Sequence, residues 1–284
     1  NRGSIIAYGD TVALIAPNVV NTGSINTPNG VTHITSANQV TLALQDGTLT
    51  QFQVDQGVVQ GLVDNQGAIV ADNGAVYLTA KGKDALSRAV VNHSGIIEAN
   101  RLSHNAKGEV ILLADMQTGL TKVTGRISAQ GMNEQDGGFI ETSAAFINIA
   151  DSADITTLSA QGKTGEWLID PFNVIISNGT NAGSQNTNNT FNPSQNDSII
   201  NVGTLQTALD KNNVTVTTAG SGTQEGNITV ADAVTWSKNT DLTLSAHNNI
   251  YINANITASH NNAGLNLEYG LANVKHDNQS DYYL

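Results

Sequence analysis

The chain has 284 residues, a net charge of −12 and an aromatic fraction of 5%. Its 12 basic residues argue against nucleic acid as a partner, because phosphate binding needs clustered Lys and Arg. Cysteine is absent, which excludes disulfides, thiolate metal sites and cysteine nucleophiles. No apolar run approaches the roughly 20 residues that span a bilayer, so we do not expect a membrane-embedded protein.

Two short sequence elements alternate along the first part of the chain. The first is Gly-x-Ile or a near equivalent, found as GSIIA at Gly3, GSINT at Gly23, GAIVA at Gly67, GIIEA at Gly95 and GRISA at Gly125. The second is Val-x-Leu-x-Ala/Leu, found as VALIA from Val12, VTLAL from Val40, VYLTA from Val76 and VILLA from Val110. Because side chains alternate along a strand, every second residue of stacked runs would form an apolar column. Spacing that varies from about 20 residues upward favours the coils of a parallel β-helix with insertions.

Two of the irregular stretches between these runs read as insertions. Residues 51–66 suggest a hairpin or a lateral strand pair, and residues 83–91 suggest a short helix. Strand patterns return late in the chain, where residues 249–259 alternate most clearly between apolar and polar positions. Coils of about 20 residues give a rod of roughly 11 coils and roughly 50 Å.

The stretch GEWLIDPFNVII, residues 165–176, is unusually apolar and aromatic for this chain. An Asp-Pro step interrupts strand pairing, so it belongs at a corner or an edge. We predict a structural joint here, in which aromatic side chains cover the point where the regular coil opens. Its residues are Trp167, Asp170, Pro171 and Phe172.

Residues 177–199 are almost entirely polar and turn-forming, which predicts an exposed loop. This loop is our candidate interaction surface, with Asn178, Asn181, Gln185, Asn188, Phe191 and Asn196 as its contact residues. Apolar residues spaced three, four and seven apart then predict a short amphipathic helix within residues 202–213. The expected organisation is β-helix coils over 1–164, an interrupting segment over 165–213, and further coils over 214–284 that are truncated at the end. We interpret the chain as an internal piece of a longer polypeptide.

Several of these stretches resemble a known family. TVALIAPNVVNTGSI (11–25), residues 55–99, GGFIETSA (137–144) and GEWLIDPFNVII are similar to the exoproteins of bacterial two-partner secretion systems, the filamentous haemagglutinin-type adhesins. The resemblance covers nearly the whole chain, and residues 141–171 are its most specific part. It implies an all-β protein, a right-handed parallel β-helix with extra-helical loops and one or two short α-helices.

The resemblance also implies a function and a location. Such proteins pass through an outer-membrane transporter and act at the bacterial cell surface or after release, where adhesins meet a receptor on host cells or other bacteria. The first expectation is therefore a segment of a secreted adhesin. The alternatives are an exoprotein that captures haem or haemopexin, and the stalk of a contact-dependent toxin carrier.

Enzymatic activity and bound cofactors are not expected. The acidic residues are scattered, and the loosest group contains Asp115, Asp136, Glu141, Asp151 and Asp154 without a repeated basic partner. The six histidines lie far apart and show no H-x-x-x-H spacing, so no metal site is predicted. The sequence also lacks the G-x-S-x-G motif of serine hydrolases.

Overall fold

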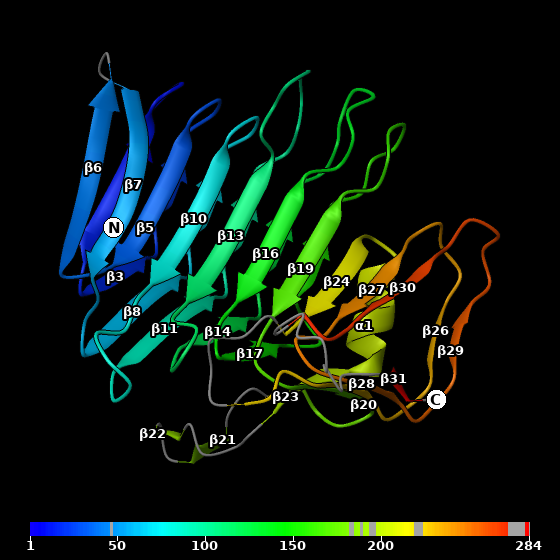
Figure 1. Ribbon diagram of the computed structural model, residues 1–284. Coiled ribbons are helices and arrows are strands. Elements are labelled where there is room, and N and C mark those ends of the chain that lie inside the picture. The colour runs from blue at the N-terminus through cyan, green and yellow to red at the C-terminus, as the bar shows by residue number, and fades with distance from the viewer. Residues whose placement is uncertain are drawn as a thin grey trace.

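The computed structural model describes residues 1–45, 48–181, 185–187, 190–192, 197–218, 224–271 and 282–283. The chain winds as a parallel β-helix, and Figure 1 shows its coils stacked along one axis from the blue N-terminal end to the orange C-terminal end. Apart from two antiparallel strand pairs, the strand pairings between described residues are parallel. The expectation of an all-β parallel β-helix is therefore confirmed.

The coils build four principal sheets. Sheet 1 has six strands, in the order β1 (Ser4–Ile6), β4 (Ser24–Asn26), β9 (Ala68–Val70), β12 (Ile96–Glu98), β15 (Arg126–Ser128) and β18 (Asp154–Thr156). Sheet 2 has nine strands, in the order β2 (Thr11–Ala16), β5 (Val31–Ser36), β10 (Ala75–Ala80), β13 (Glu109–Ala114), β16 (Phe139–Ser143), β19 (Glu166–Asp170), β24 (Asn213–Thr217), β27 (Leu242–Ser245) and β30 (Leu265–Glu268). Sheet 3 has five strands, in the order β17 (Phe146–Ile149), β14 (Leu120–Val123), β11 (Arg88–His93), β8 (Gln60–Asn65) and β3 (Asn18–Asn21). Sheet 4 has five strands, in the order β23 (Ser198–Asn201), β20 (Val174–Ser177), β25 (Ile228–Val230), β28 (Ile250–Ile252) and β31 (Tyr282–Tyr283).

Smaller elements complete the described structure. Three pairs of strands stand outside the principal sheets, namely β26 (Val234–Trp236) with β29 (Ile256–Ala258), β6 (Gln39–Gln45) with β7 (Thr48–Gln56), and β21 (Gln185–Thr187) with β22 (Thr190–Asn192). One helix is present in the described part of the chain, α1 (Val202–Leu209). A typical early coil passes from sheet 1 to sheet 2 and then to sheet 3 before the next coil begins.

Apolar columns run along the inside of sheet 2, as the alternating pattern predicts. Val76 pairs with Val110 and Leu78 pairs with Leu112, and all four side chains are fully buried. Side chains between them, such as Tyr77, face outward and are only partly buried. Stacking each coil on the previous one therefore buries the alternate apolar residues that a single coil would leave exposed.

The repeated glycine has a steric cause at the corner where each coil enters sheet 1. A Cβ built on Gly23 would lie 2.1 Å from the carbonyl oxygen of Gly3 in the preceding coil. A Cβ built on Gly67 would likewise lie 2.0 Å from the carbonyl oxygen of Gly23, and one built on Gly95 would lie 2.0 Å from that of Gly67. These separations are far below van der Waals contact, so each of these corners requires a residue without a side chain.

Two predictions about the early coils are wrong. The run from Val40 was placed in an apolar column, but it forms β6 of an antiparallel hairpin, and Leu44 is 67% exposed. The core strand of that coil is β5, whose alternation includes Thr32 and is less apolar. Residues 83–91 were expected to carry a helix, but they form a turn followed by β11.

The stretch 165–176 contains two regular strands joined at a corner. Trp167 is 2% exposed and pairs in register with Ile140 of the preceding coil. Asp170 ends β19, and Pro171 lies between β19 and β20, where it removes no ladder hydrogen bond. Phe172 packs edge-on against Phe146, with 6.0 Å between their ring centroids. The coil leaves its regular path only after β20 ends.

The predicted amphipathic helix is confirmed, and it takes the place of a sheet 1 strand in the stack. Asn201 caps it by accepting hydrogen bonds from the backbone N–H groups of Gly203 and Thr204. On one side, the amide of Asn212 donates to the carbonyl of Ile155 in β18. On the other, the side chain of Gln206 accepts a hydrogen bond from the backbone of β26. Sheet 1 thus stops at β18, whereas sheet 2 continues directly from β19 to β24.

Candidate functional site

The candidate interaction loop begins with a well-anchored base. Asn181 is 8% exposed, and its amide donates to Asp151 at 2.8 Å and to the hydroxyl of Thr204 at 2.7 Å. Its side-chain oxygen accepts the backbone N–H of Asn201 at 2.6 Å. Asn178 is exposed, and its backbone N–H donates to Asp232. Asn181 therefore ties the two ends of the loop to the rod, and both hydrogens of its amide are used in doing so.

The other candidate residues lie farther out. Gln185 begins β21 and Phe191 is the middle residue of β22, and these two strands pair antiparallel with Asn186 opposite Phe191. Figure 1 shows this strand pair standing away from the stacked coils. Asn188 and Asn196 lie outside the described residues. The interaction surface thus stays a prediction, carried by the strand pair beyond the anchored base.

A second excursion was missed as an interaction candidate. The β6–β7 hairpin leaves the coil after β5, and its Phe52 ring stacks on His33 of β5 with 4.2 Å between centroids. His33 also stacks on Tyr77 of β10, at 4.8 Å. Burial foremost, and the charge of Lys107 second, lower the pKa of His33 to about 4, so the ring is neutral within the stack. A hairpin or lateral strand pair was expected over residues 51–66, but the hairpin begins at Gln39 and ends at Gln56, and residues 60–65 form β8 of sheet 3.

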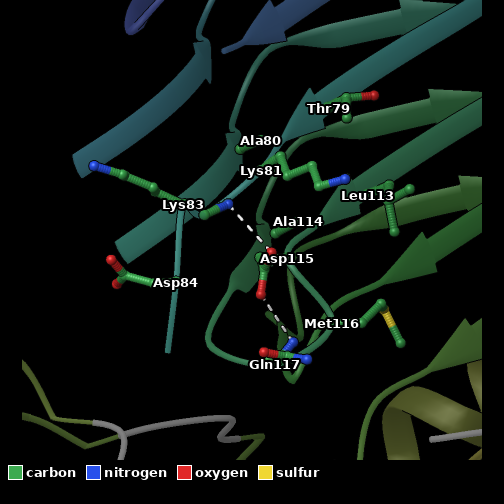
Figure 2. Close-up of a pocket in the computed structure, with 11 residues that line it drawn as sticks. Thr79, Ala80, Lys81, Lys83, Asp84, Leu113, Ala114, Asp115, Met116 and Gln117 are labelled. Atoms are coloured by element: carbon green, nitrogen blue, oxygen red, sulfur yellow. Dashed lines mark hydrogen bonds between the residues drawn. The ribbon is translucent and has the colours of Figure 1, made fainter. Parts of the chain in front are cut away.

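A hollow of about 430 Å³ lies where β10 and β13 end, and Lys81 and Lys83 are among the residues that line it (Figure 2). Its central carboxylate, Asp115, accepts backbone N–H bonds from Gln117, Thr118 and Gly82. Figure 2 shows Lys83 extending away from Asp115. Asp115 therefore stabilises the turn after β13, and the side chain of Lys83 does not point toward it.

Of the other scattered acidic residues, Glu141 lies near Asp170 of the next coil, and the remaining three do not converge. Asp136 accepts the backbone N–H of Lys163, and Asp151 is bound to Asn181 and Thr204. Asp154 pairs with Arg126 at 3.7 Å and with Lys211 at 2.6 Å. Each of these carboxylates is thus satisfied by a different part of the fold.

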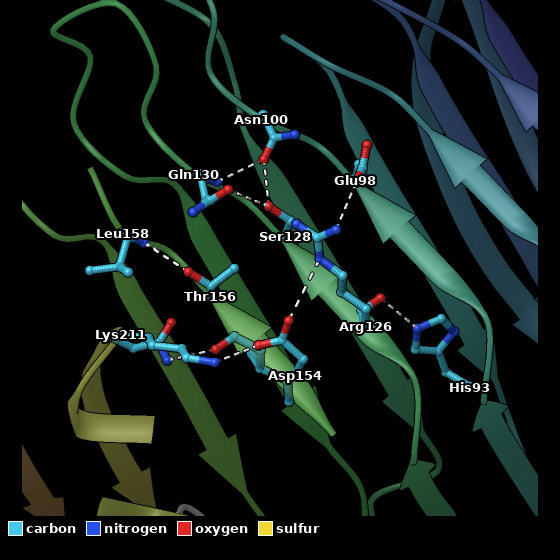
Figure 3. Close-up of polar contacts among 12 residues, drawn as sticks. His93, Glu98, Asn100, Arg126, Ser128, Gln130, Asp154, Thr156, Leu158 and Lys211 are labelled. Atoms are coloured by element: carbon cyan, nitrogen blue, oxygen red, sulfur yellow. Dashed lines mark hydrogen bonds and ion pairs between the residues drawn. The ribbon is translucent and has the colours of Figure 1, made fainter. Parts of the chain in front are cut away.

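Figure 3 shows that Asp154 belongs to a ladder of alternating charge along the outside of sheet 1. Arg126 also pairs with Glu98 of the preceding coil, at 3.6 Å, so the order along the stack is Glu98, Arg126, Asp154 and Lys211. The side chain of Arg126 is 45% exposed, and exposed pairs of this kind each contribute little to stability.

A buried polar ladder runs inside the corner between sheets 3 and 1. Asn21 donates to Asn65 at 2.7 Å, and Asn65 lies 3.1 Å from Nδ1 of His93. The other ring nitrogen of His93 lies 3.0 Å from the carbonyl of Arg126, so this nitrogen carries the proton. Burial lowers the pKa of His93 and keeps the ring neutral. His93 is therefore a structural residue that ends the ladder.

One carboxylate on the outer side of sheet 2 stands out. Asp170 has an oxygen, Oδ1, that is buried and finds no partner within the described residues. Burial foremost, and then the neighbouring charge of Glu141, raise the pKa of Asp170 to about 7.

Within the described part of the chain, no group of three His, Asp or Glu side chains is placed to hold a metal ion. The described residues likewise form no helix of the length and apolarity that membrane crossing requires.

No family model matches the chain. Over 120 residues it is 32% identical to a heme/hemopexin-binding protein of Haemophilus influenzae strain Rd, a match covering 40% of this chain and 13% of that protein. A second heme/hemopexin-binding protein of H. influenzae is 34% identical over 83 residues, which is 29% of this chain and 8% of the relative. The chain therefore spans only a small part of the curated relatives it matches, and the similarity to them is local.

Proposed function

We propose that this chain is a segment of a secreted bacterial surface exoprotein of the adhesin type. In this proposal the β-helix supplies rigid length, and excursions from its coils bind host cells or other bacteria. We propose a binding role without catalysis, because separate parts of the fold hold Asp115, Asp136, Asp151 and Asp154. The local similarity to the two heme/hemopexin-binding proteins supports the secreted class.

One observation carries the proposal. Glu166 of β19 pairs directly with Asn213 of β24, although the β21–β22 excursion and α1 lie between them in sequence. Sheet 2 therefore keeps its register across a long excursion, which the rod accommodates without a break. Such an arrangement suits the display of a binding segment on a rigid support.

The test replaces residues 182–196 with a short Gly/Ser linker and leaves Asn181 in place. A parallel variant replaces residues 40–55 in the same way and tests the second excursion, the β6–β7 hairpin. Beads coated with each protein are then scored for adhesion to epithelial cells and to bacteria. We expect the first replacement to lower adhesion while far-UV circular dichroism stays unchanged; adhesion equal to that of the intact chain counts against the 177–199 loop.

The second candidate function is capture of haem-loaded haemopexin, and the names of the two local relatives favour it. Immobilised chain is exposed to apo-haemopexin, haem-loaded haemopexin and haem alone, and binding is followed by interferometry. Saturable binding of haemopexin without adhesion to cells would favour this second function. Adhesion without haemopexin binding would favour the first.

We also propose an export partner, an outer-membrane transporter of the two-partner type, and a location at the cell surface or outside the cell. The cysteine-free composition suits this route, because an unfolded chain then crosses an oxidising compartment without forming disulfides. Full-length protein expressed with and without the transporter should appear in the medium only with it. Equal secretion in both strains would contradict the proposal.

A further inference from the structure

A polar groove crosses the starts of several sheet 2 strands, on their outer side. Its volume is about 490 Å³, and its lining extends from Arg101, in the loop before β13, to Asn266 in β30. These residues are separated by five steps of the coil stack, so at about 4.8 Å per step the groove is roughly 24 Å long. Strand residues from Phe139 in β16 to Asn266 in β30 line it, and Figure 1 shows these strands stacked in order from green to orange.

The floor of the groove carries hydroxyl, amide and carboxylate groups in register. Thr215, Thr243 and Asn266 are paired neighbours on β24, β27 and β30, so they repeat once per coil. Thr215 donates to one oxygen of Glu166 at 2.7 Å, and Asn266 donates to Thr243 at 3.2 Å. The floor therefore presents a row of polar side chains at the spacing of the coils.

Two carboxylates in the groove keep unused hydrogen-bonding capacity. Within the described residues, the second oxygen of Glu166 and both oxygens of Asp241 accept no hydrogen bond from the protein. A Cβ built on Gly264 would lie 2.7 Å from Oδ1 of Asp241, so glycine leaves that carboxylate room. Carboxylates in such positions accept strong charge-assisted bonds from hydroxyl donors.

An aromatic ring lies beside these polar groups. Phe139 lines the groove at the start of β16 and is only partly buried. Sites that combine an aromatic face with a few fixed polar groups recognise small molecules having both apolar and polar faces. A pyranose ring fits this description, because its C–H faces pack on aromatic rings and its hydroxyl groups lie around its rim.

Extended peptides and polyanions fit the groove less well. The groove runs across the strands, so it exposes no strand edge for the main chain of a peptide to pair with. Of its cations, Lys107 is already paired with Glu109 at 2.8 Å, and Arg101 donates to two backbone carbonyls. The net charge of −12 also repels polyanions.

We propose that this groove binds a neutral oligosaccharide laid along the rod axis, with Glu166 and Asp241 accepting hydrogen bonds from its hydroxyl groups. The site is distinct from the 177–199 loop. Binding here does not depend on the adhesion function proposed for that loop.

The test titrates the chain with neutral hexasaccharides and disaccharides of glucose, mannose and N-acetylglucosamine, using calorimetry. We expect at least one hexasaccharide to bind at least about tenfold more tightly than its disaccharide, because the groove is several sugars long. The double variant Glu166→Gln/Asp241→Asn should weaken that binding about tenfold or more. The control Asp10→Asn/Glu134→Gln makes the same change of charge at exposed positions outside the groove and should leave affinity unchanged.

Thermal unfolding of both double variants shows whether the fold is intact, and saturation-transfer NMR on the intact chain reports binding independently of them. No binding of any neutral hexasaccharide at about 5 mM would overturn the proposal. Tighter binding of a heparin hexasaccharide, or equal loss of affinity in the control variant, would overturn it as well. The variant with residues 182–196 replaced should bind the sugar normally, which separates failure of this site from failure of the loop.

Discussion

The ammonium group of Lys211 lies 2.6 Å from Oδ1 of Asp154, and the next residue, Asn212, is fully buried against the same strand. Asn212 donates to the carbonyls of Ile155 and Ala208 and accepts the hydroxyl of Thr157. Adjacent residues thus join α1 to β18 in two ways, one by an ion pair at the surface and one by a buried hydrogen-bond network.

The two connections should differ in strength. Asn212→Ala leaves buried carbonyl and hydroxyl groups without partners, and we expect the free energy of unfolding to fall by about 3 kcal/mol. Lys211→Met removes a pair whose side chains are 35% and 46% exposed, and the expected loss is about 0.5 kcal/mol. Urea unfolding followed by tryptophan fluorescence measures both. A loss from Lys211→Met as large as that from Asn212→Ala would contradict the assignment.

The glycine column gives a second comparison. Gly67→Ala places a Cβ about 2.0 Å from the carbonyl oxygen of Gly23, so a coil must shift, and we expect a loss of about 3 kcal/mol or more. Gly3→Ala is the control, because a Cβ there meets nothing within 4 Å. Thermal and urea unfolding of the two variants should differ clearly. Equal stability would mean that the corner adapts to a side chain.

His33 should make stability fall in mild acid. Its pKa is about 4 in the folded chain and about 6.5 when unperturbed, so between these pH values the unfolded chain takes up a proton that the folded chain refuses. The free energy of unfolding should drop by about 2 kcal/mol across this window, after allowance for partial exposure, and the contribution is fully present above it. His33→Gln should flatten this part of the pH profile measured by urea unfolding. An unchanged slope would exclude His33 as its source.

Asp170 should act in the opposite direction. Its pKa is raised from 3.8 to about 7, so between these two pH values the folded chain holds a proton that the unfolded chain releases. Asp170→Asn imitates the protonated form, and we expect it to raise the free energy of unfolding by about 1–2 kcal/mol at pH 8 and by little at pH 5. Asp10→Asn, at an exposed position, is the control and should change neither value. The same gain at both pH values would count against a buried charge.

Much of the fold follows from local patterns in the sequence. The runs from Val76 and Val110 have the period of a strand, and the structure stacks them as predicted. The spacing of Val202, Leu205 and Leu209 likewise predicts the helix, and all three side chains are buried. These patterns succeed because each element buries one face against a neighbouring coil.

Other features depend on contacts that a local pattern does not contain. The run from Val40 alternates like a core strand, yet the core position in that coil belongs to β5, and the run became half of a hairpin. The sugar groove is assembled from residues as far apart as Arg101 and Asn266. No stretch of sequence between them marks a common surface, because only the stacking of coils brings them into register.

The alternating charges along sheet 1 bear on how the stack is assembled. Neighbouring coils have nearly the same shape and bury similar side chains, so shape alone distinguishes poorly between one coil and the next. Omitting the coil that carries Arg126 would bring Glu98 toward Asp154, and omitting the coil that carries Asp154 would bring Arg126 toward Lys211. Either error sets like charges side by side. Electrostatic repulsion between these exposed residues therefore disfavours a stack in which one coil has been skipped.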